Sequence, residues 1–560
     1  MALALNPVTT TTFPQEWNAG IEPGETYRFD PMHFPFALSP LTLSAIGRAF
    51  GPGATAGFRS LRLPIAEIRT VIRNHYRYEN WVQAEPRNEV EAREFAETAE
   101  ASMQVEVGRL MERWENEHLP RVLQHLERLQ AMDVEGATVS MLHALLDEAD
   151  AIHEDLWNIH FQVAPPMLLA MQLFDEFYAD VVGGSETDGH ALLVGNPSQS
   201  VKAGIGLSDL AHDARVLGVA DTILDGDMET LVDELEQTGS GIAFLARLDF
   251  YLKEFGLRQD LFELATPTWL EDPSIALASV RNYLRSGHDA EREHERRAAA
   301  AARELVRVRQ RLAAYPEAVR NHFETMVLAG RAGAFLQEEH NFYIDQRGLA
   351  SLRLFYLRVG QRLVDAGLLN RADDVVMFTI DEIHDALVLL RSPHATDRLR
   401  AFVAVREQEL AIARKMTPPP FIGDAPAGPP TGENPMERAT MRFFGGPPEQ
   451  AADPNQVKGN GGSKGVVTGI ARVAPTLEEA TALQPGEVLV AITTMPAWTP
   501  LFGIAAAVVT ETGGALSHCA IVAREYGIPA VVGAYGATQR IRTGQRVTVD
   551  GTSGLVTLEA

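Results

Sequence analysis

A sharp change in composition near residue 416 is the feature that most limits how this chain can fold. Before it, long stretches repeat apolar residues at mixed spacings of three and four, which is the pattern of amphipathic helices. After it, short β-type runs alternate with turn residues. Residues 416–460 between them are dense in proline and glycine, so we expect an inter-domain linker there.

This division predicts a multidomain chain of α plus α/β class, with a mostly helical domain (1–415), a linker (416–460) and a small α/β domain (461–560). The first 80 residues look irregular, and we expect Pro120 and the Pro165-Pro166 pair to break helices. Helices are expected at about 88–132, 138–164, 166–182, 208–218, 226–237, 240–256, 273–284, 289–314, 316–345, 348–367, 380–391 and 395–415.

Charge and composition exclude several functional classes. The 560 residues carry a net charge of -26, which argues against a surface that binds nucleic-acid phosphates. No run approaches 18 apolar residues, and the start of the chain has no basic segment before an apolar run, so we expect a cytoplasmic protein without a membrane partner. The single cysteine, Cys519, permits no internal disulfide, and we expect it to pack as a small apolar residue.

The stretch TETGGALSHCAIVAREYGIPAVVG, residues 510–533, carries the clearest chemical signal. An apolar run ends at Thr512, turns at a glycine pair and enters a helical pattern near Ser517, which predicts His518 in the first helical turn. Unpaired N–H groups and the positive end of the helix dipole favour an anion there, and they favour a neutral, nucleophilic imidazole over imidazolium.

We therefore predict that His518 accepts a phosphoryl group and that Thr512, Gly513, Gly514 and Ser517 bind its oxygens. The alternative is that the glycine pair is only a tight turn and that His518 is a capping or half-buried residue.

The whole run from 510 to 533 resembles the phosphohistidine signature of the swivelling domain in phosphoenolpyruvate (PEP)-utilising enzymes, a family that includes PEP synthase, pyruvate phosphate dikinase and rifampin phosphotransferase. GVVTGIARV and GEVLVAITTMPAWTPLF upstream are also similar to that domain, so the resemblance covers roughly residues 460–560. It implies that His518 is a phosphoryl carrier. We expect neither the ATP-grasp domain nor the PEP-binding barrel of the larger family members in this sequence.

A more diffuse resemblance concerns the acceptor. Residues 338–383 and the stretch MHFPFALSPL resemble the acceptor domains of rifampin phosphotransferase and of the phenylphosphate synthase type, whose phosphohistidine subunit is served by a separate ATP-grasp protein. This implies that a partner subunit transfers the β-phosphoryl group of ATP to His518, leaving AMP and phosphate, and that a small phenolic compound receives it. ATP and Mg2+ or Mn2+ are then expected on the partner, with no metal held by this chain.

Histidines and aromatics mark candidates for the acceptor pocket. His153, Trp157 and His160 fall at i, i+4 and i+7, so they share one helical face, which is also a pattern of ordinary packing. The other candidates are His33 with Phe34, where core filling is the alternative, and His340, Tyr343 and Arg353 in the segment that resembles the acceptor domain.

Two other functions fit the same residues. The acceptor could be another alcohol, such as an antibiotic of the rifampin type, because the sequence does not determine how large the pocket is. The chain could instead be a regulatory carrier, in which phosphorylation of His518 acts as a regulatory signal and the helical region binds a protein.

Overall fold

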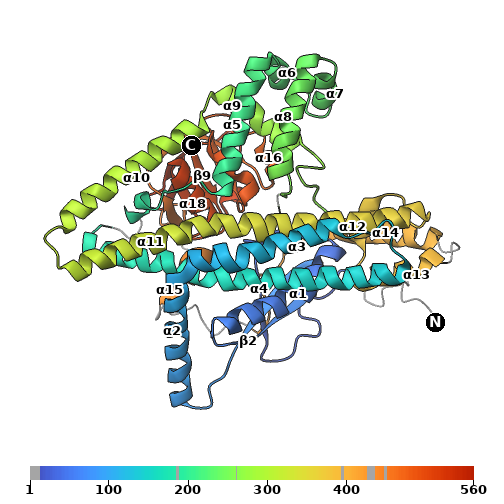
Figure 1. Ribbon diagram of the computed structural model, residues 1–560, viewed down its shortest axis with the longest axis horizontal. Helices are drawn as coiled ribbons and strands as arrows, with labels where there is room; N and C mark the ends of the chain where they lie inside the picture. The colour runs from blue at the N-terminus through green and yellow to red at the C-terminus, as the bar shows by residue number, and fades with distance from the viewer. Residues whose placement is uncertain are drawn as a thin grey trace. The chain divides into compact units, whose positions relative to one another are not determined.

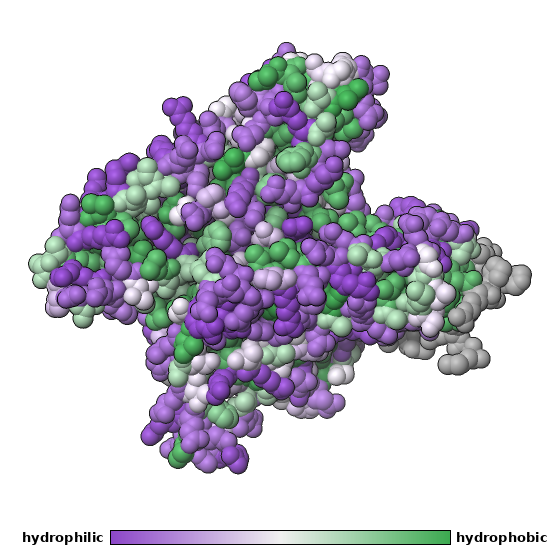
Figure 2. All heavy atoms as spheres, viewed as in Figure 1, coloured by the Kyte–Doolittle hydropathy of each residue, from purple (hydrophilic) through white to green (hydrophobic). Residues whose placement is uncertain are grey.

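The computed structural model describes residues 13–184, 188–259, 261–391, 396–424, 435–446 and 451–559. The expectation about the start of the chain rests mainly on residues 1–12, which lie outside these ranges. No helix in the described ranges is long and apolar enough to cross a lipid bilayer. Most of the face drawn in Figure 2 is hydrophilic, and apolar residues occur on it singly or in small groups.

The chain divides into two compact units by its internal contacts. Unit 1 contains residues 1–163, 261–266 and 343–428, and unit 2 contains residues 164–260, 267–342 and 429–560. The fold class is the predicted one, since a large helical region precedes a C-terminal α/β domain. The division does not follow the expected boundaries at 415 and 461, because the α/β domain forms one unit with helices of the central part of the chain.

Unit 1 combines helices with a small antiparallel sheet. Among its described residues the strand order is β2-β3-β1-β4. Its strands are β1 (Thr26–Phe29), β2 (Ile65–Arg73), β3 (Tyr76–Gln83) and β4 (Phe421–Gly423), and its helices are α1 (Pro40–Ser60), α2 (Glu89–Arg113), α3 (Leu119–Ala131), α12 (Arg347–Asp365), α13 (Ile380–Val388) and α14 (Thr396–Ala413). Helix α4 (Val139–Phe177) contributes residues to both units.

The expectation of an irregular start is wrong, because residues 26–83 hold three strands and the helix α1. Ser39 caps α1 and Pro40 occupies its first turn. The glycines that hide the helical pattern in this stretch are required by close packing against α4. A Cβ atom on Gly53 would lie 2.3 Å from the carbonyl oxygen of Glu154, and one on Gly57 would lie 2.7 Å from that of Asn158.

The expected linker is partly structured. Residues 421–423 form β4, which pairs with β1 and completes the sheet of unit 1. Residues Pro435–Phe444 form helix α15, and Gln456–Lys458 form strand β5, both in unit 2. Local composition predicted a linker here because proline and glycine dominate it, whereas pairing with distant strands and carboxylates decides the structure of these short segments.

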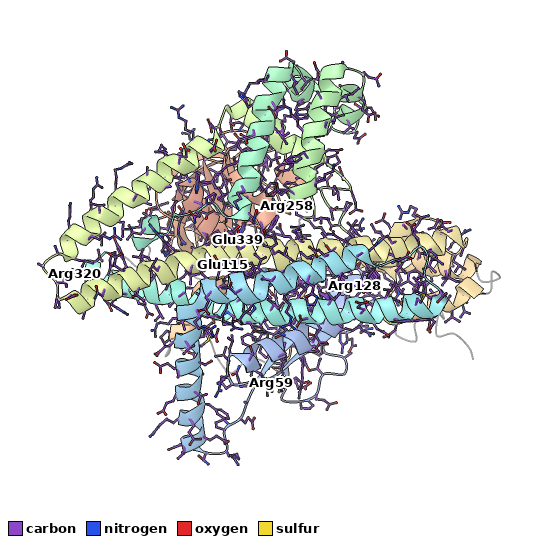
Figure 3. All side chains as sticks on the ribbon, viewed as in Figure 1. Arg59, Glu115, Arg128, Arg258, Arg320 and Glu339 are labelled. Atoms are coloured by element: carbon purple, nitrogen blue, oxygen red, sulfur yellow. The ribbon has the colours of Figure 1, made fainter. Side chains whose placement is uncertain are left out.

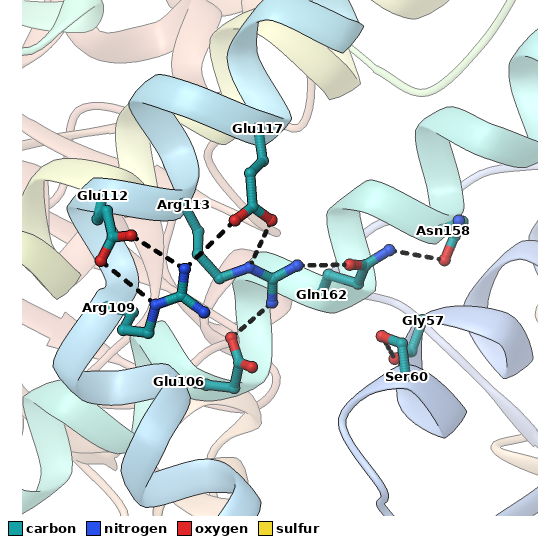
Figure 4. A network of polar contacts seen from close by, with 9 residues as sticks. All are labelled: Gly57, Ser60, Glu106, Arg109, Glu112, Arg113, Glu117, Asn158 and Gln162. Atoms are coloured by element: carbon teal, nitrogen blue, oxygen red, sulfur yellow. Dashed lines mark hydrogen bonds and ion pairs between the residues drawn. The ribbon is translucent and has the colours of Figure 1, made fainter.

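The predicted break near Pro120 is confirmed. A π-helical segment, Trp114–His118, separates α2 from α3. Arg113, just before it, donates to Glu106 at 2.5 Å, to Glu117 at 2.9 Å and to Gln162 of α4 at 3.1 Å (Figure 4). The last of these bonds ties the segment to α4.

The Pro165-Pro166 pair does not end a helix, contrary to expectation, because α4 continues through it to Phe177. A proline inside a helix costs about 3 kcal/mol, since it removes a hydrogen bond and clashes with an earlier carbonyl. Both prolines and the four residues after them are buried, and this apolar burial offsets the cost.

Unit 2 carries most of the remaining helices. They are α5 (Gln199–Leu217), α6 (Ala220–Asp225), α7 (Leu231–Glu236), α8 (Gly239–Phe255), α9 (Ser274–Ser286), α10 (Ala290–Leu312), α11 (Glu317–His340), α15 (Pro435–Phe444), α16 (Leu477–Ala480), α17 (Thr499–Phe502), α18 (His518–Tyr526) and α19 (Ala537–Arg540). Figure 1 shows α5 and α8 side by side, with α6 and α7 at their far ends. Several expected helices have ends within a few residues of those predicted, but α5 begins well before residue 208.

The sheet of unit 2 has a parallel centre. Among the described residues its order is β5-β12-β11-β7-β8-β9-β10-β6, and the neighbours from β7 to β10 run parallel. Its strands are β5 (Gln456–Lys458), β6 (Asn460–Ser463), β7 (Val466–Val473), β8 (Val488–Ala491), β9 (Ala507–Thr510), β10 (Ala530–Val532), β11 (Arg546–Asp550) and β12 (Leu555–Leu558). Helix α18 is the crossover between the parallel strands β9 and β10, so its first turn lies beyond the carboxyl end of β9, where α/β sheets bind ligands.

Candidate active site

The predicted strand, turn and helix around His518 are confirmed. Strand β9 ends at Thr510, and α18 begins at His518 with Ser517 as its N-cap. Gly527 ends the helix in the left-handed conformation, with φ of 62°. The side-chain hydroxyl of Ser517 is buried and has no hydrogen-bond partner among the described residues.

The glycine pair is held against the end of α15. The backbone N–H of Gly514 donates to the carbonyl oxygen of Phe443 at 2.8 Å, and that of Leu516 donates to the carbonyl oxygen of Arg442 at 2.9 Å. Gly513 has φ of 93°, which disfavours other residues. A Cβ atom on Gly514 would lie 2.1 Å from the carbonyl oxygen of Arg442, so only glycine allows this approach.

Thr512 stabilises the same loop. Its hydroxyl donates to the carbonyl oxygen of Ile492 at 3.2 Å, and its N–H donates to the same oxygen at 3.1 Å. The predicted role of Thr512, Gly513, Gly514 and Ser517 in binding phosphate stays a prediction. Of the two hydroxyls in the set, that of Ser517 is the one without a protein partner in the described structure.

His518 meets a carboxylate far away in the sequence. Its Nδ1 lies 2.9 Å from Oε1 of Glu338 on α11, and both residues belong to unit 2. Glu338 is fully buried and His518 is 8% exposed. An ionised carboxylate can only accept, so Nδ1–H is the donor, and in neutral imidazole this leaves the lone pair on Nε2. That Nε2 atom is buried and has no hydrogen-bond partner among the described residues.

The charges around this pair are strongly perturbed. Burial raises the pKa of Glu338, but the adjacent His518 imidazole outweighs it and holds the pKa below its usual range. Burial and the nearby Glu338 raise the pKa of Glu525 to about 8, against the attraction of Arg297. Burial also raises the pKa of Glu339 to about 7, although its carboxylate accepts a hydrogen bond from the N–H of Gln199 at 2.8 Å. One ionised carboxylate therefore faces His518, while at pH 7 Glu525 favours the protonated form and Glu339 is divided between its two forms.

A second cluster lies within unit 1 and joins predicted residues from separate segments. The ring of Phe262 lies 5.6 Å from Phe34, 6.0 Å from His33 and 6.3 Å from Trp157, measured between ring centroids. The Trp157 ring lies 5.2 Å from His160. We call these five residues the aromatic cluster. Both of its histidines have acidic partners, since His33 is 2.7 Å from Asp30 and His160 is 2.9 Å from Asp345.

Comparison with known proteins identifies the domain that carries His518. Residues 483–554 match the family model of the PEP-utilising enzyme mobile domain, and residues 159–338 match that of the rifampicin phosphotransferase fourth domain. The C-terminal α/β domain is a PEP-utilising enzyme mobile domain. Glu338 is the last residue of the second match, so the contact between His518 and Glu338 joins the two matched regions.

Several known proteins are similar to long parts of this chain. Chondramide synthase of Chondromyces crocatus is 33% identical over 98% of this chain, which spans 14% of that protein. The uncharacterized phosphotransferase YvkC of Bacillus subtilis (strain 168) is 30% identical over 79% of this chain, and the match covers 53% of that protein. Rifampicin phosphotransferase of Streptomyces sviceus is 31% identical over 63% of this chain, and the match covers 39% of that protein. The chain therefore spans about half or less of each of these relatives.

The roles predicted for the other pocket residues stay predictions, and the structure shows some of their contacts. His153 is buried and accepts a hydrogen bond from Nε1 of Trp157 at 3.0 Å, and burial lowers its pKa to about 4, so it is held neutral. His340 bonds through Nδ1 to the carbonyl oxygen of Leu336 in its own helix at 2.7 Å. The Tyr343 ring lies 6.3 Å from that of Trp114.

Arg353 is also engaged in unit 1. Its buried guanidinium donates to the carbonyl oxygen of Leu264 at 2.7 Å and to Asp373 at 2.8 Å. In the mobile domain, Cys519 is buried, as expected of a small packing residue, and burial raises its pKa to about 12. Its thiol is therefore held in the protonated form.

Sequence reasoning missed Glu338, although it singled out His340 and Tyr343 from the same stretch. A signal was available in α11. Phe323, Val327 and Gly330 mark its buried face, and Glu338 lies three turns beyond Val327 on that face. A carboxylate continuing a buried face requires a partner, although the sequence does not say which residue supplies it.

Proposed function

We propose that this chain is a phosphotransferase component that carries a phosphoryl group on Nε2 of His518 and passes it to the hydroxyl of a small aromatic, phenol-type acceptor. The observation that carries the proposal is the contact between Nδ1 of His518 and Glu338, which leaves the buried Nε2 as the nucleophilic nitrogen. The kinship of its two matched regions with the PEP-utilising enzymes and with rifampicin phosphotransferase supports the same chemistry.

The charging step forms a bond between Nε2 and phosphorus. We propose that the β-phosphoryl group comes from ATP on a separate ATP-grasp protein, with water taking the γ-phosphoryl group, so that AMP and phosphate are released. Mg2+ or Mn2+ would accompany the nucleotide on that partner and offset the phosphate charge. Throughout this step Nδ1–H of His518 stays hydrogen-bonded to the carboxylate of Glu338. The negative charge of Glu338 stabilises the positive imidazole ring that phosphorylation creates.

In the transfer step the hydroxyl oxygen of the acceptor attacks phosphorus. An O–P bond forms, the N–P bond breaks, and Nε2 recovers its lone pair, while the hydroxyl proton goes to a base or to solvent. A phenol has a pKa near 10, so a weaker base is enough to deprotonate it than an aliphatic alcohol needs. The aromatic cluster of unit 1 supports an aromatic acceptor, because it gathers several rings and two histidines in one place.

A second candidate acceptor is a larger alcohol of the rifampicin type. The match of residues 159–338 to the fourth domain of rifampicin phosphotransferase favours it, because that segment contains Glu338. Testing phenols and rifampicin as acceptors in parallel distinguishes the two candidates.

The test is intact-mass analysis of the purified chain with ATP and Mg2+, with and without a candidate ATP-grasp protein. We expect one acid-labile phosphoryl group, absent from His518→Ala and lost when a phenol is added. Glu338→Gln should slow charging roughly 10²–10⁴-fold, because an amide no longer fixes the imidazole tautomer. Labelling that no hydroxyl compound removes would instead indicate a regulatory carrier.

A further inference from the structure

Arg258 is a buried guanidinium with no hydrogen-bond partner in the part of the chain that the structure describes. It lies three residues beyond the end of α8, is 0% exposed, and is labelled in Figure 3. Its Nε, Nη1 and Nη2 atoms all lack a hydrogen-bond partner among the described residues. Its central carbon lies 5.1 Å from the ring of Trp269 and 5.5 Å from the ring of Phe342, so two aromatic rings are its near neighbours.

Such an arrangement is costly unless an anion completes it. Guanidinium stays charged in proteins, and a buried charge is normally paired and hydrogen-bonded. Aromatic rings supply attraction to a cation but accept none of its five N–H groups conventionally. Arg258 therefore presents a planar fork of donors with the geometry that suits a carboxylate or a phosphoryl group.

The polar atoms near the carrier histidine share this lack of partners. Among the described residues of unit 2, Nε2 of His518, Oγ of Ser517, Oε2 of Glu338 and Oε1 of Gln337 are buried without hydrogen bonds. Burial lowers the pKa of Arg258, and the nearby Tyr251 and Glu338 oppose this shift. Phe342, whose ring lies 5.5 Å from the guanidinium carbon of Arg258, follows Glu338 by four residues, because α11 runs directly into a π-helical segment, Asn341–Gln346. Arg258 and the carboxylate that contacts His518 therefore meet the same stretch of helix.

We propose that Arg258 binds an oxyanionic group at this site, either the phosphoryl group carried by His518 or an anionic substituent of the acceptor. The assignment of those two sources rests on the proposed function, but the binding of an oxyanion by Arg258 does not. Trp269 and Phe342 hold the fork in place, and Arg258 is the positive charge that balances the ligand.

The first experiment measures anion binding to the uncharged full chain by isothermal titration calorimetry, with inorganic phosphate and with benzoate as probes. The variants are Arg258→Met, Arg258→Lys and the control Arg281→Met, which removes an arginine that donates to the carbonyl oxygens of Ile223 and Gly226 in the same unit. We expect Arg258→Met to weaken binding about tenfold or more, Arg258→Lys to bind with intermediate affinity because a single ammonium lacks the fork, and the control to match the wild type.

The two probes distinguish the sources. Phosphate binding that depends on Arg258 indicates the carried phosphoryl group, whereas benzoate binding that depends on Arg258 indicates an anionic acceptor. Equal binding by the wild type and Arg258→Met, or no binding of either probe by the wild type, overturns the proposal. If Arg258→Met fails to fold by circular dichroism, the comparison of Arg258→Lys with the wild type decides in the same way.

A second experiment separates this proposal from the proposed function. His518 is charged chemically with phosphoramidate, and transfer to a phenol is followed in the wild type and in Arg258→Lys. If His518 is neither charged nor discharged, the proposed function fails while the anion titration still stands. If transfer occurs and neither transfer nor anion binding changes in Arg258→Lys, the role of Arg258 fails while the proposed function stands.

Discussion

Arg442 of α15 donates to the carboxylate of Asp175 on α4 at 2.7 Å, and Asp175 is completely buried. His190 contacts the same carboxylate at 2.7 Å. The carbonyl oxygen of Arg442 accepts from the N–H of Leu516, in the loop that leads to His518. A single residue of the expected linker therefore joins the helical part of unit 2 to the loop of the mobile domain.

We predict that Arg442→Met lowers the free energy of unfolding by about 3 kcal/mol, because it leaves a buried carboxylate without its cationic partner. Denaturant unfolding measures this. Arg472→Met is the matched control, since Arg472 pairs with Glu487 at a partly exposed position of the same unit and its loss should cost about 1 kcal/mol or less. Equal effects of the two variants would contradict the structural role of Arg442.

Gly514→Ala should impair charging of His518. The added Cβ would meet the carbonyl oxygen of Arg442 at 2.1 Å, so the loop has to move and the first turn of α18 moves with it. We expect the rate of His518 charging, measured by intact mass, to fall about 100-fold. A small misplacement of a reacting group is enough to lower a reaction rate by that much. Gly239→Ala is the control, since its Cβ would meet no atom within 4 Å. Charging at the wild-type rate in Gly514→Ala would show that the loop tolerates the shift.

Phe262→Ala should reduce acceptor binding without changing the charging of His518. Phe262 is the ring shared by most of the aromatic cluster, and its loss removes stacking surface. We expect the KM for a phenolic acceptor to rise about tenfold, with phosphoryl loading unchanged. Phe378→Ala, which removes a buried ring stacked on Phe402 elsewhere in unit 1, serves as the control for lost packing. An equal rise in KM in the control would place the acceptor outside the aromatic cluster.

The contribution of His153 to stability should fall as the pH drops from 6.5 towards 4. Burial lowers the pKa of His153 from 6.5 to about 4, so in that window the unfolded chain binds the proton that the folded chain excludes. His153 therefore contributes stability that is complete above the unfolded pKa and is lost as the pH approaches the folded one. His153→Gln should flatten the slope of unfolding free energy against pH by at most about 1.4 kcal/mol per pH unit. An unchanged slope would contradict a neutral, buried His153.

The sequence predicted the local structure around His518 well because each signal acts within a few residues. Apolar residues predicted β9, the Ser517 cap and the Gly527 terminus delimited α18, and the glycine pair marked the turn. The same local reasoning failed for α1, since glycines that allow close packing against α4 conceal a helix from a periodicity argument.

By itself the sequence determined that a histidine stands at the start of a helix after a glycine turn, and that helices precede a small α/β domain. Only the tertiary structure decided which groups meet this histidine and each other. Glu338 lies 180 residues from His518, the aromatic cluster gathers residues from three separate segments, and Arg258 faces two rings from other parts of the chain. The physical reason is that caps and turns depend on neighbouring residues, whereas the pairing of buried charges and rings depends on how distant segments fold together.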